Sequence, residues 1–142
     1  MVSTAIAYTV LTIALVGLLG FTVIVGGILQ TAQNVPATYT ELGTLTYSVQ
    51  EQMVSAYRAS LNIKGTVYSS IYAPTNIYSL KYTLTVTANG RLIDATCGSV
   101  DRTFSLPILP GATWAGTFRS GATYIRISAF YLNGAVTVTM SD

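Results

Sequence analysis

The chain has 142 residues, a formal net charge of +2, no histidine and a single cysteine. This composition excludes an intrachain disulfide, and it excludes metal or catalytic sites built on histidine or on several cysteines, so no cofactor and no enzymatic activity are expected. The seven basic residues are scattered singly, which gives nucleic acid no electrostatic footprint to bind.

The first forty residues contain no Asp, Glu, Lys or Arg, and Glu41 is the first charged residue of the chain. Residues 5–29 are almost wholly apolar. As an α-helix rising about 1.5 Å per residue they would span roughly 37 Å, enough to cross a bilayer core of about 30 Å. We therefore predict two parts: a hydrophobic helix over residues 1–35 and an outer domain over residues 36–142.

Three interpretations compete for this apolar segment. A cleaved secretory signal needs a basic start and a short apolar core, whereas this segment is long and uncharged. An ordinary membrane span usually has flanking Lys or Arg, and both flanks here are neutral. The third interpretation is that a short basic leader once preceded Met1 and was removed, and that the helix later leaves the membrane to pack against other helices.

The apolar helix is predicted to be buried on every side, in lipid or among neighbouring helices. Its glycines weaken an isolated helix but let backbones approach closely, although glycine is also simply common in membrane helices. The residues expected to form the assembly core are Ile6, Val10, Ile13, Gly17, Leu18, Gly20, Phe21, Ile24, Gly26, Gly27 and Ile28.

The helix is expected to end at Val35, because Pro36 disfavours the α conformation at the residue before it. The stretch 39–60 is ambiguous between a short helix and a strand. The alternation of Thr44, Thr46 and Val49 favours a strand near Thr44–Val49.

From residue 66 onward the pattern is that of short β-strands. Two runs of alternating apolar and polar residues are followed by Asn89-Gly90 and by Asn133-Gly134, which is the strongest short signal for a β-hairpin. We predict an α+β protein whose outer domain is an antiparallel β-sandwich of the immunoglobulin-like kind, with six or seven strands. The expected strand regions are 65–72, 78–87, 91–93, 103–106, 113–119, 124–132 and 135–140.

One region of the outer domain brings together residues that could be considered for a cation site. Asp94, Cys97 and Asp101 lie in a glycine-containing stretch interpreted as a solvated loop, because two carboxylates and a thiol are too few ligands for a cation. Cys97 is expected to be a small buried hydrophobe.

The last strand, Val136–Met140, contains no charge and would be an aggregation hazard as an exposed edge, unless a neighbouring subunit covers it. The ten tyrosines are expected mainly to fill the core or contact neighbouring subunits, with sugar stacking as the alternative.

The whole arrangement resembles a processed archaeal type IV pilin. The resemblance is carried by the uncharged start Met1–Tyr8, the long apolar helix to about Val35 and the Ser/Thr-rich β domain behind it. It implies cutting of a short leader by a prepilin peptidase at the membrane, followed by extraction of the helices into a fibre core with the β domains outside. Bacterial type IV pilins have a glutamate where this chain has Ala5. Archaeal flagellins begin with a glycine-rich, acid-containing segment that is absent here, which favours an adhesion pilus.

The expected function is therefore structural: the major subunit of an extracellular adhesion pilus, which forms a helical homopolymer through its apolar helix. Expected partners are the pilus assembly machinery and the membrane before assembly. The surface rich in Ser and Thr suits either close packing against copies or O-linked glycans. A motility filament of the archaeal flagellin type and a single-span surface receptor whose β domain acts alone are the alternatives.

Overall fold

The computed structural model describes the backbone of residues 2–87 and 89–142, and the side chains of residues 10–30, 34–87 and 89–142. The chain divides into two compact units, Met1–Pro36 and Ala37–Asp142. The boundary between the units lies one residue from the predicted domain boundary, but the secondary structure on its C-terminal side differs from the prediction.

Helix α1 spans Val2–Ile63 and contains Pro36 in its interior. The prediction that the helix ends at Val35 is therefore wrong. Proline lacks a backbone N–H and costs about 3 kcal/mol in a helix interior. Beyond Pro36, however, Leu42, Val49 and other large apolar side chains of the helix are fully buried. Each such side chain contributes about 1.5–3 kcal/mol, so their combined burial outweighs the penalty from proline.

The predicted strand near Thr44–Val49 is also wrong, because these residues belong to α1. The buried residues Leu42, Leu45, Val49, Met53 and Ala56 recur at intervals of three and four, which is the period of a helix with one buried face. The polar residues between them do not oppose the helix. Thr46, for example, is buried and donates its hydroxyl hydrogen bond to the carbonyl oxygen of Leu42 at 2.7 Å.

The remainder of the second unit forms one seven-stranded sheet with the order β1-β6-β7-β5-β2-β3-β4. Neighbouring strands are antiparallel except β5 and β7, which pair in parallel. The strands are β1 Val67–Tyr72, β2 Tyr82–Val86, β3 Leu92–Cys97, β4 Val100–Ser105, β5 Ala112–Arg119, β6 Tyr124–Leu132 and β7 Ala135–Ser141.

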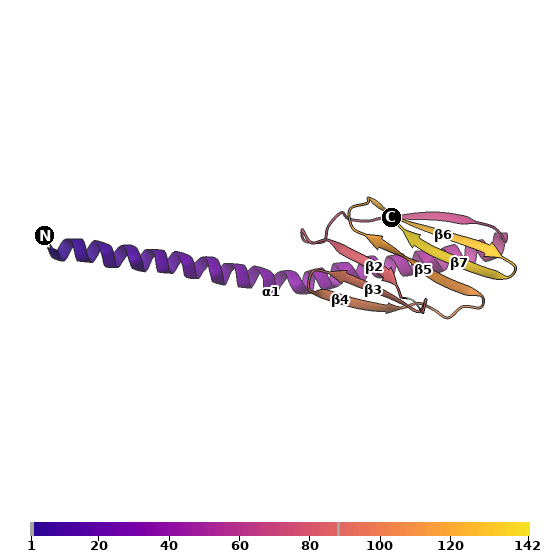
Figure 1. Cartoon of the computed structure of the whole chain (residues 1–142), viewed down its shortest axis with the longest axis horizontal. Coiled ribbons are helices and arrows are strands. Elements are labelled where there is room, and N and C mark those ends of the chain that lie inside the picture. The colour runs from indigo at the N-terminus through magenta and orange to yellow at the C-terminus, as the bar shows by residue number, and fades with distance from the viewer. Residues whose placement is uncertain (1, 88) are drawn as a thin grey trace. The chain divides into compact units, whose positions relative to one another are not determined.

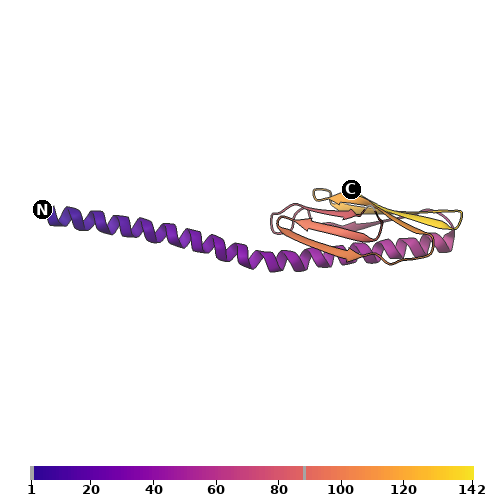
Figure 2. The ribbon, with the colours of Figure 1, turned by 60° about the horizontal axis from the view of Figure 1, so that its bottom comes forward.

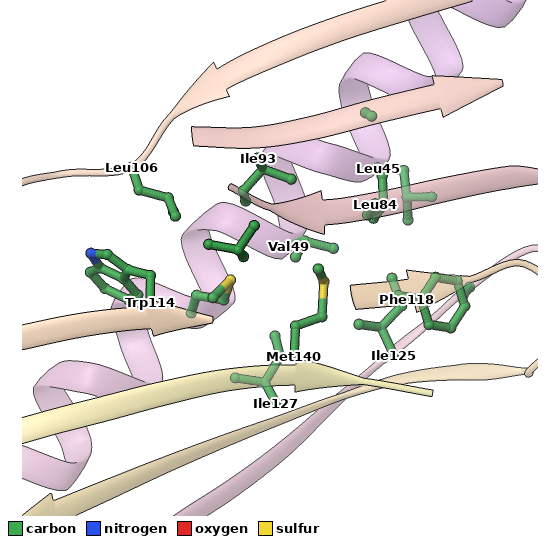
Figure 3. Close-up of a cluster of buried hydrophobic side chains, with 14 of the residues drawn as sticks. Leu45, Val49, Leu84, Ile93, Leu106, Trp114, Phe118, Ile125, Ile127 and Met140 are labelled. Atoms are coloured by element: carbon green, nitrogen blue, oxygen red, sulfur yellow. The ribbon is translucent and has the colours of Figure 1, made fainter. Parts of the chain in front are cut away.

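The α+β class and a sandwich-like second unit are confirmed: a long N-terminal helix is followed by a mostly antiparallel sheet. Within this unit the sheet lies along residues 37–63 of α1, as Figure 1 and Figure 2 show. The helix and one face of the sheet share a single core. Figure 3 shows Leu45 and Val49 of the helix directed towards strand residues such as Leu84, Ile127 and Met140.

Both predicted hairpin turns are present. Asn133 and Gly134 have φ values of 50° and 87°, as a type I′ turn between β6 and β7 requires. Between β2 and β3, Gly90 has φ 59°, and the Thr87 N–H donates to the carbonyl oxygen of Leu92 at 2.9 Å.

Other details of the β region differ from the sequence prediction. Residues 78–81 are not part of β2, because Tyr78 and Ser79 adopt positive φ values of 48° and 65° in a turn. Asp94 and Cys97 lie in β3 and Asp101 lies in β4, so these residues form a hairpin rather than a loop. Cys97 is fully buried, as predicted.

The concern about an exposed C-terminal edge is also removed. Strand β7 lies in the interior of the sheet, where it pairs with both β6 and β5. The two edges of the sheet are β1 and β4. Val136, Val138 and Met140 are buried against the core and need no neighbouring subunit to cover them.

Candidate assembly surface

The apolar segment of the first unit, residues 10–30, exposes more than half of the surface of most of its large side chains. The exposed fractions run from 53% at Leu15 to 73% at Val23. Such a surface is far larger than the apolar patches of ordinary soluble monomers. The exposed large apolar residues of this segment are Val10, Leu11, Ile13, Leu15, Val16, Leu18, Leu19, Phe21, Val23, Ile24, Ile28 and Leu29.

This apolar surface surrounds the helix instead of forming one stripe. Val10, Ile13, Gly17, Phe21 and Ile24 follow each other at intervals of three and four residues, so they share a face. The remaining apolar residues occupy the other faces, and the segment contains no Asp, Glu, Lys or Arg. A helix that is apolar all round is stable only when it is surrounded by lipid or by other apolar helices.

The few polar groups of the segment are compatible with such surroundings. Thr22 donates its hydroxyl hydrogen bond to the carbonyl oxygens of Leu18 and Leu19, each at 2.9 Å. This local bonding satisfies the hydroxyl without water or a partner side chain. Among the described residues, one helix, α1, is long and apolar enough to cross a membrane. Residues 13–29 therefore contain no charged group, and their one hydroxyl is satisfied within the helix, so they can be transferred out of water.

Four glycines interrupt the apolar surface of the segment. A Cβ atom built on Gly17, Gly20, Gly26 or Gly27 would meet nothing within 4 Å. Each glycine nevertheless lowers helix stability by about 1 kcal/mol relative to alanine. No described side chain lies so close that it would require glycine at these positions. Close approach by the backbone of another helix would explain the glycines.

Most of the predicted assembly residues thus lie together on this exposed segment, from Val10 to Ile28. The side chain of Ile6 lies outside the described residues. Val35 and Pro36 are exposed but do not end the helix, as described above.

The sequence prediction missed a second group of residues, which fixes the sheet to residues 37–63 of α1. Arg102 of β4 donates a hydrogen bond to the carbonyl oxygen of Tyr39 at 3.1 Å. Tyr57 donates its hydroxyl hydrogen bond to the carbonyl oxygen of Pro110 at 2.7 Å, and its ring lies 5.9 Å from that of Trp114. Gln50 donates to the carbonyl oxygen of Ser105 at 2.7 Å. The spacing of Leu42, Leu45, Val49 and Met53 was the sequence signal that could have placed these residues on a helix.

No group of three or more His, Cys, Asp or Glu residues suited to a metal ion occurs among the described residues. Burial raises the pKa of the Cys97 thiol, with a smaller contribution from the charge of Glu41. A raised pKa keeps the thiol protonated, and the protonated form is the unreactive one.

Comparisons with known proteins found no matching family model, no matching curated protein and no matching solved structure. The functional interpretation of the chain therefore depends on its own geometry and chemistry.

Proposed function

We propose that this protein is the subunit of an extracellular helical filament of the type IV pilus class, with residues 10–30 of α1 as its assembly surface. The second unit is the part displayed on the outside of the filament. Adhesion is the proposed role of the filament, and this chain is its major subunit. A prepilin peptidase and the pilus assembly machinery are the partners that this role requires, and O-linked glycans are proposed for its Ser- and Thr-rich surface.

The observation that supports this proposal is the exposure of a charge-free apolar surface on all sides of residues 10–30. A lone membrane anchor needs apolar side chains and tolerates glycines, which are common in membrane helices. A packed bundle uses both, because the glycines allow helices to approach closely while the apolar side chains fill the space between them.

The energy available for assembly is large. At about 25 cal/mol per Å² of apolar surface removed from water, burial of this segment contributes on the order of tens of kcal/mol per subunit before ordering costs. Contacts between subunits that repeat head to tail without closing generate a filament. The same surface is stable in lipid before assembly.

The proposal is tested by electron cryo-microscopy of the sheared extracellular fraction from cells that produce the protein. Filaments with a dense helical core that can be traced to this chain are the expected result. Leu18→Lys introduces a charge into the assembly surface, where Leu18 is 65% exposed, and is expected to abolish filaments while the second unit stays folded. Ile108→Lys is the matched control, because Ile108 is 85% exposed in the second unit, and it should leave filaments intact. Normal filaments from Leu18→Lys would contradict the proposal.

A single-span, membrane-anchored surface receptor is the second proposal. It is supported by the length and apolar composition of α1, which suffice to cross a membrane. Under this proposal the protein stays with the membrane fraction after shearing, and the second unit binds its ligand as a monomer. Recovery of the protein only in membranes, with no filament that contains it, would favour this function over the filament.

A further inference from the structure

The outer face of the sheet, opposite the helix, contains a groove of about 410 Å³ over strands β1, β6 and β7. We call it the β1–β6 groove. Its volume is within the roughly 300–1,000 Å³ of small-molecule sites in proteins. Its lining is dominated by hydroxyl groups and contains one charge, that of Arg126. The lining residues whose side chains lie on this outer face are Tyr68, Ser70, Arg126, Ser128 and Ser141.

The register of the strands explains how these side chains meet. Arg126 of β6 lies opposite Ser70 of β1 on one side and opposite Ser141 of β7 on the other. Opposed residues in neighbouring strands direct their side chains to the same face of a sheet. The guanidinium therefore has a hydroxyl-bearing neighbour on each adjacent strand. Ser128, two residues along β6 from Arg126, lies opposite Tyr68 of β1. This pair adds a further hydroxyl from Ser128 and an aromatic ring from Tyr68.

The aromatic side chains of this face are unusually accessible. Tyr68 is 81% exposed. Tyr72 and Tyr124, which lie opposite each other on the side of Arg126 away from Tyr68, are also exposed. The rings of Tyr72 and Tyr124 lie 6.2 Å apart in an edge-to-face arrangement. These tyrosines do not serve the hydrophobic core, because it is the other face of the same strands that contributes Ile125 and Ile127 to the core. Rings that are exposed next to hydroxyl groups are suited to stacking on the apolar face of a sugar.

The charge of the groove is unbalanced. In the part of the chain that the structure describes, no carboxylate forms an ion pair with Arg126. Its planar guanidinium can form two parallel hydrogen bonds with a carboxylate, which is a strong and geometrically specific arrangement. Since β1 is an edge strand of the sheet, a polymer longer than the groove can continue past that edge.

From these observations we infer that the β1–β6 groove binds a carboxylate-bearing saccharide, such as a chain of uronic acids. Arg126 binds the carboxylate, Ser70, Ser128 and Ser141 bind sugar hydroxyls, and Tyr68 stacks on a sugar ring. The site lies entirely within the second unit, so this inference does not rest on the proposed filament.

The test uses the full chain, kept unassembled in a detergent whose head group contains no sugar. Titration calorimetry with a galacturonate tetrasaccharide is expected to show binding that weakens with added salt. The methyl ester of the same tetrasaccharide, which lacks the charge, is expected to bind about tenfold more weakly. Because the chain is unassembled, a failure here and a failure of filament formation are separate results.

Variants assign the binding to the groove. Arg126→Gln is expected to weaken binding about tenfold, and Tyr68→Ala severalfold. Arg91→Gln is the matched control, because it removes the same charge from an exposed position outside the groove, and it should bind as the unmodified chain does. Circular dichroism shows whether each variant is folded.

Three results would overturn the inference. The first is the absence of binding by the unmodified chain at millimolar tetrasaccharide. The second is equal weakening by Arg91→Gln and Arg126→Gln, which indicates attraction to charge in general. The third is displacement of the tetrasaccharide by inorganic phosphate or acetate at equal concentration, which indicates an anion site that does not recognise sugar.

Discussion

The guanidinium of Arg102 on β4 lies over the ring of Tyr39 on α1, with its central carbon 4.0 Å from the ring centroid. The same guanidinium hydrogen-bonds the carbonyl oxygen of Tyr39 and lies 4.8 Å from the ring centroid of Phe104. Gly43, one turn further along the helix, leaves the room that this side chain occupies. A methyl group on Gly43 would overlap the Arg102 guanidinium. This contact joins the edge strand β4 to the helix within the second unit.

The effect of a methyl group at Gly43 should therefore depend on Arg102. In the unmodified chain, Gly43→Ala displaces the guanidinium, and the lost contacts with Tyr39 cancel or exceed the gain of about 1 kcal/mol in helix propensity. In an Arg102→Ala background the obstacle is gone, and Gly43→Ala is expected to stabilise the fold by up to about 1 kcal/mol. Urea unfolding of the four variants measures this coupling, and identical effects of Gly43→Ala in both backgrounds would disprove the contact.

Truncation of Met53 tests whether residues 37–63 of α1 form one layer of the core. Met53 is fully buried, so Met53→Ala should lower the free energy of unfolding by about 2–5 kcal/mol. Ser55→Ala, two residues along the helix at an exposed position, should change it by less than about 0.5 kcal/mol. Equal, small effects of both substitutions in chemical unfolding would argue against the helix–sheet core.

The turn between β6 and β7 depends on a residue that tolerates positive φ. Asn133 has φ 50°, a conformation that costs a β-branched residue about 1–2 kcal/mol. Asn133→Val is expected to destabilise the fold by about that amount, whereas Asn133→Gly should be nearly neutral. Thermal unfolding monitored by circular dichroism distinguishes the two. A Val variant as stable as the Gly variant would contradict the assigned turn.

Tyr82 should make the second unit sensitive to alkali. Its hydroxyl donates to the carbonyl oxygen of Pro74 at 2.8 Å. Burial, with smaller contributions from Cys97, Glu41 and Tyr72, raises the pKa of Tyr82 from 10.0 to about 12. Because the pKa is higher in the folded state than in the unfolded state, the protonated phenol favours folding below pH 10.0. This contribution is lost as the pH rises from 10.0 towards about 12.

Measurement of unfolding free energy across that pH range, for the unmodified chain and for Tyr82→Phe, isolates the effect. The unmodified chain should lose stability more steeply than Tyr82→Phe, which has no phenol to ionise at this position. Parallel declines in the two proteins would show that Tyr82 is not the responsible group.

The sequence was informative where a local pattern has one structural solution. The two Asn-Gly pairs predicted both hairpins, because such turns require positive φ. The almost wholly apolar composition of residues 5–29 predicted a helix. The region after Pro36 failed because two local signals opposed the tertiary outcome. Proline and the alternation of threonines around Thr44 favoured a break and a strand. Burial of Leu42, Val49 and Met53 against a sheet far away in the sequence decided for the helix.

The β1–β6 groove could not be predicted for a related reason. Arg126 and Ser70 are separated by more than fifty positions, and Ser141 comes from a third strand. Their proximity depends on the register of β1 with β6 and of β6 with β7. A hairpin turn sets the register of adjacent strands, but no sequence rule places β1 beside β6. Arg126 accordingly looked like one of several scattered charges.

The position of β7 has a consequence for how the protein is made. The last strand of the chain separates β6 from β5, and it contributes the parallel pairing with β5 that joins the two parts of the sheet. β7 follows the helix and the other six strands in the chain, so it leaves the ribosome after all of them. The sheet is therefore completed only after β7 has been synthesised, and a chain truncated before Ala135 lacks an interior strand of the sheet. Such a chain leaves two unconnected strand groups with exposed edges, which a cell's proteases and chaperones can distinguish from the completed sheet.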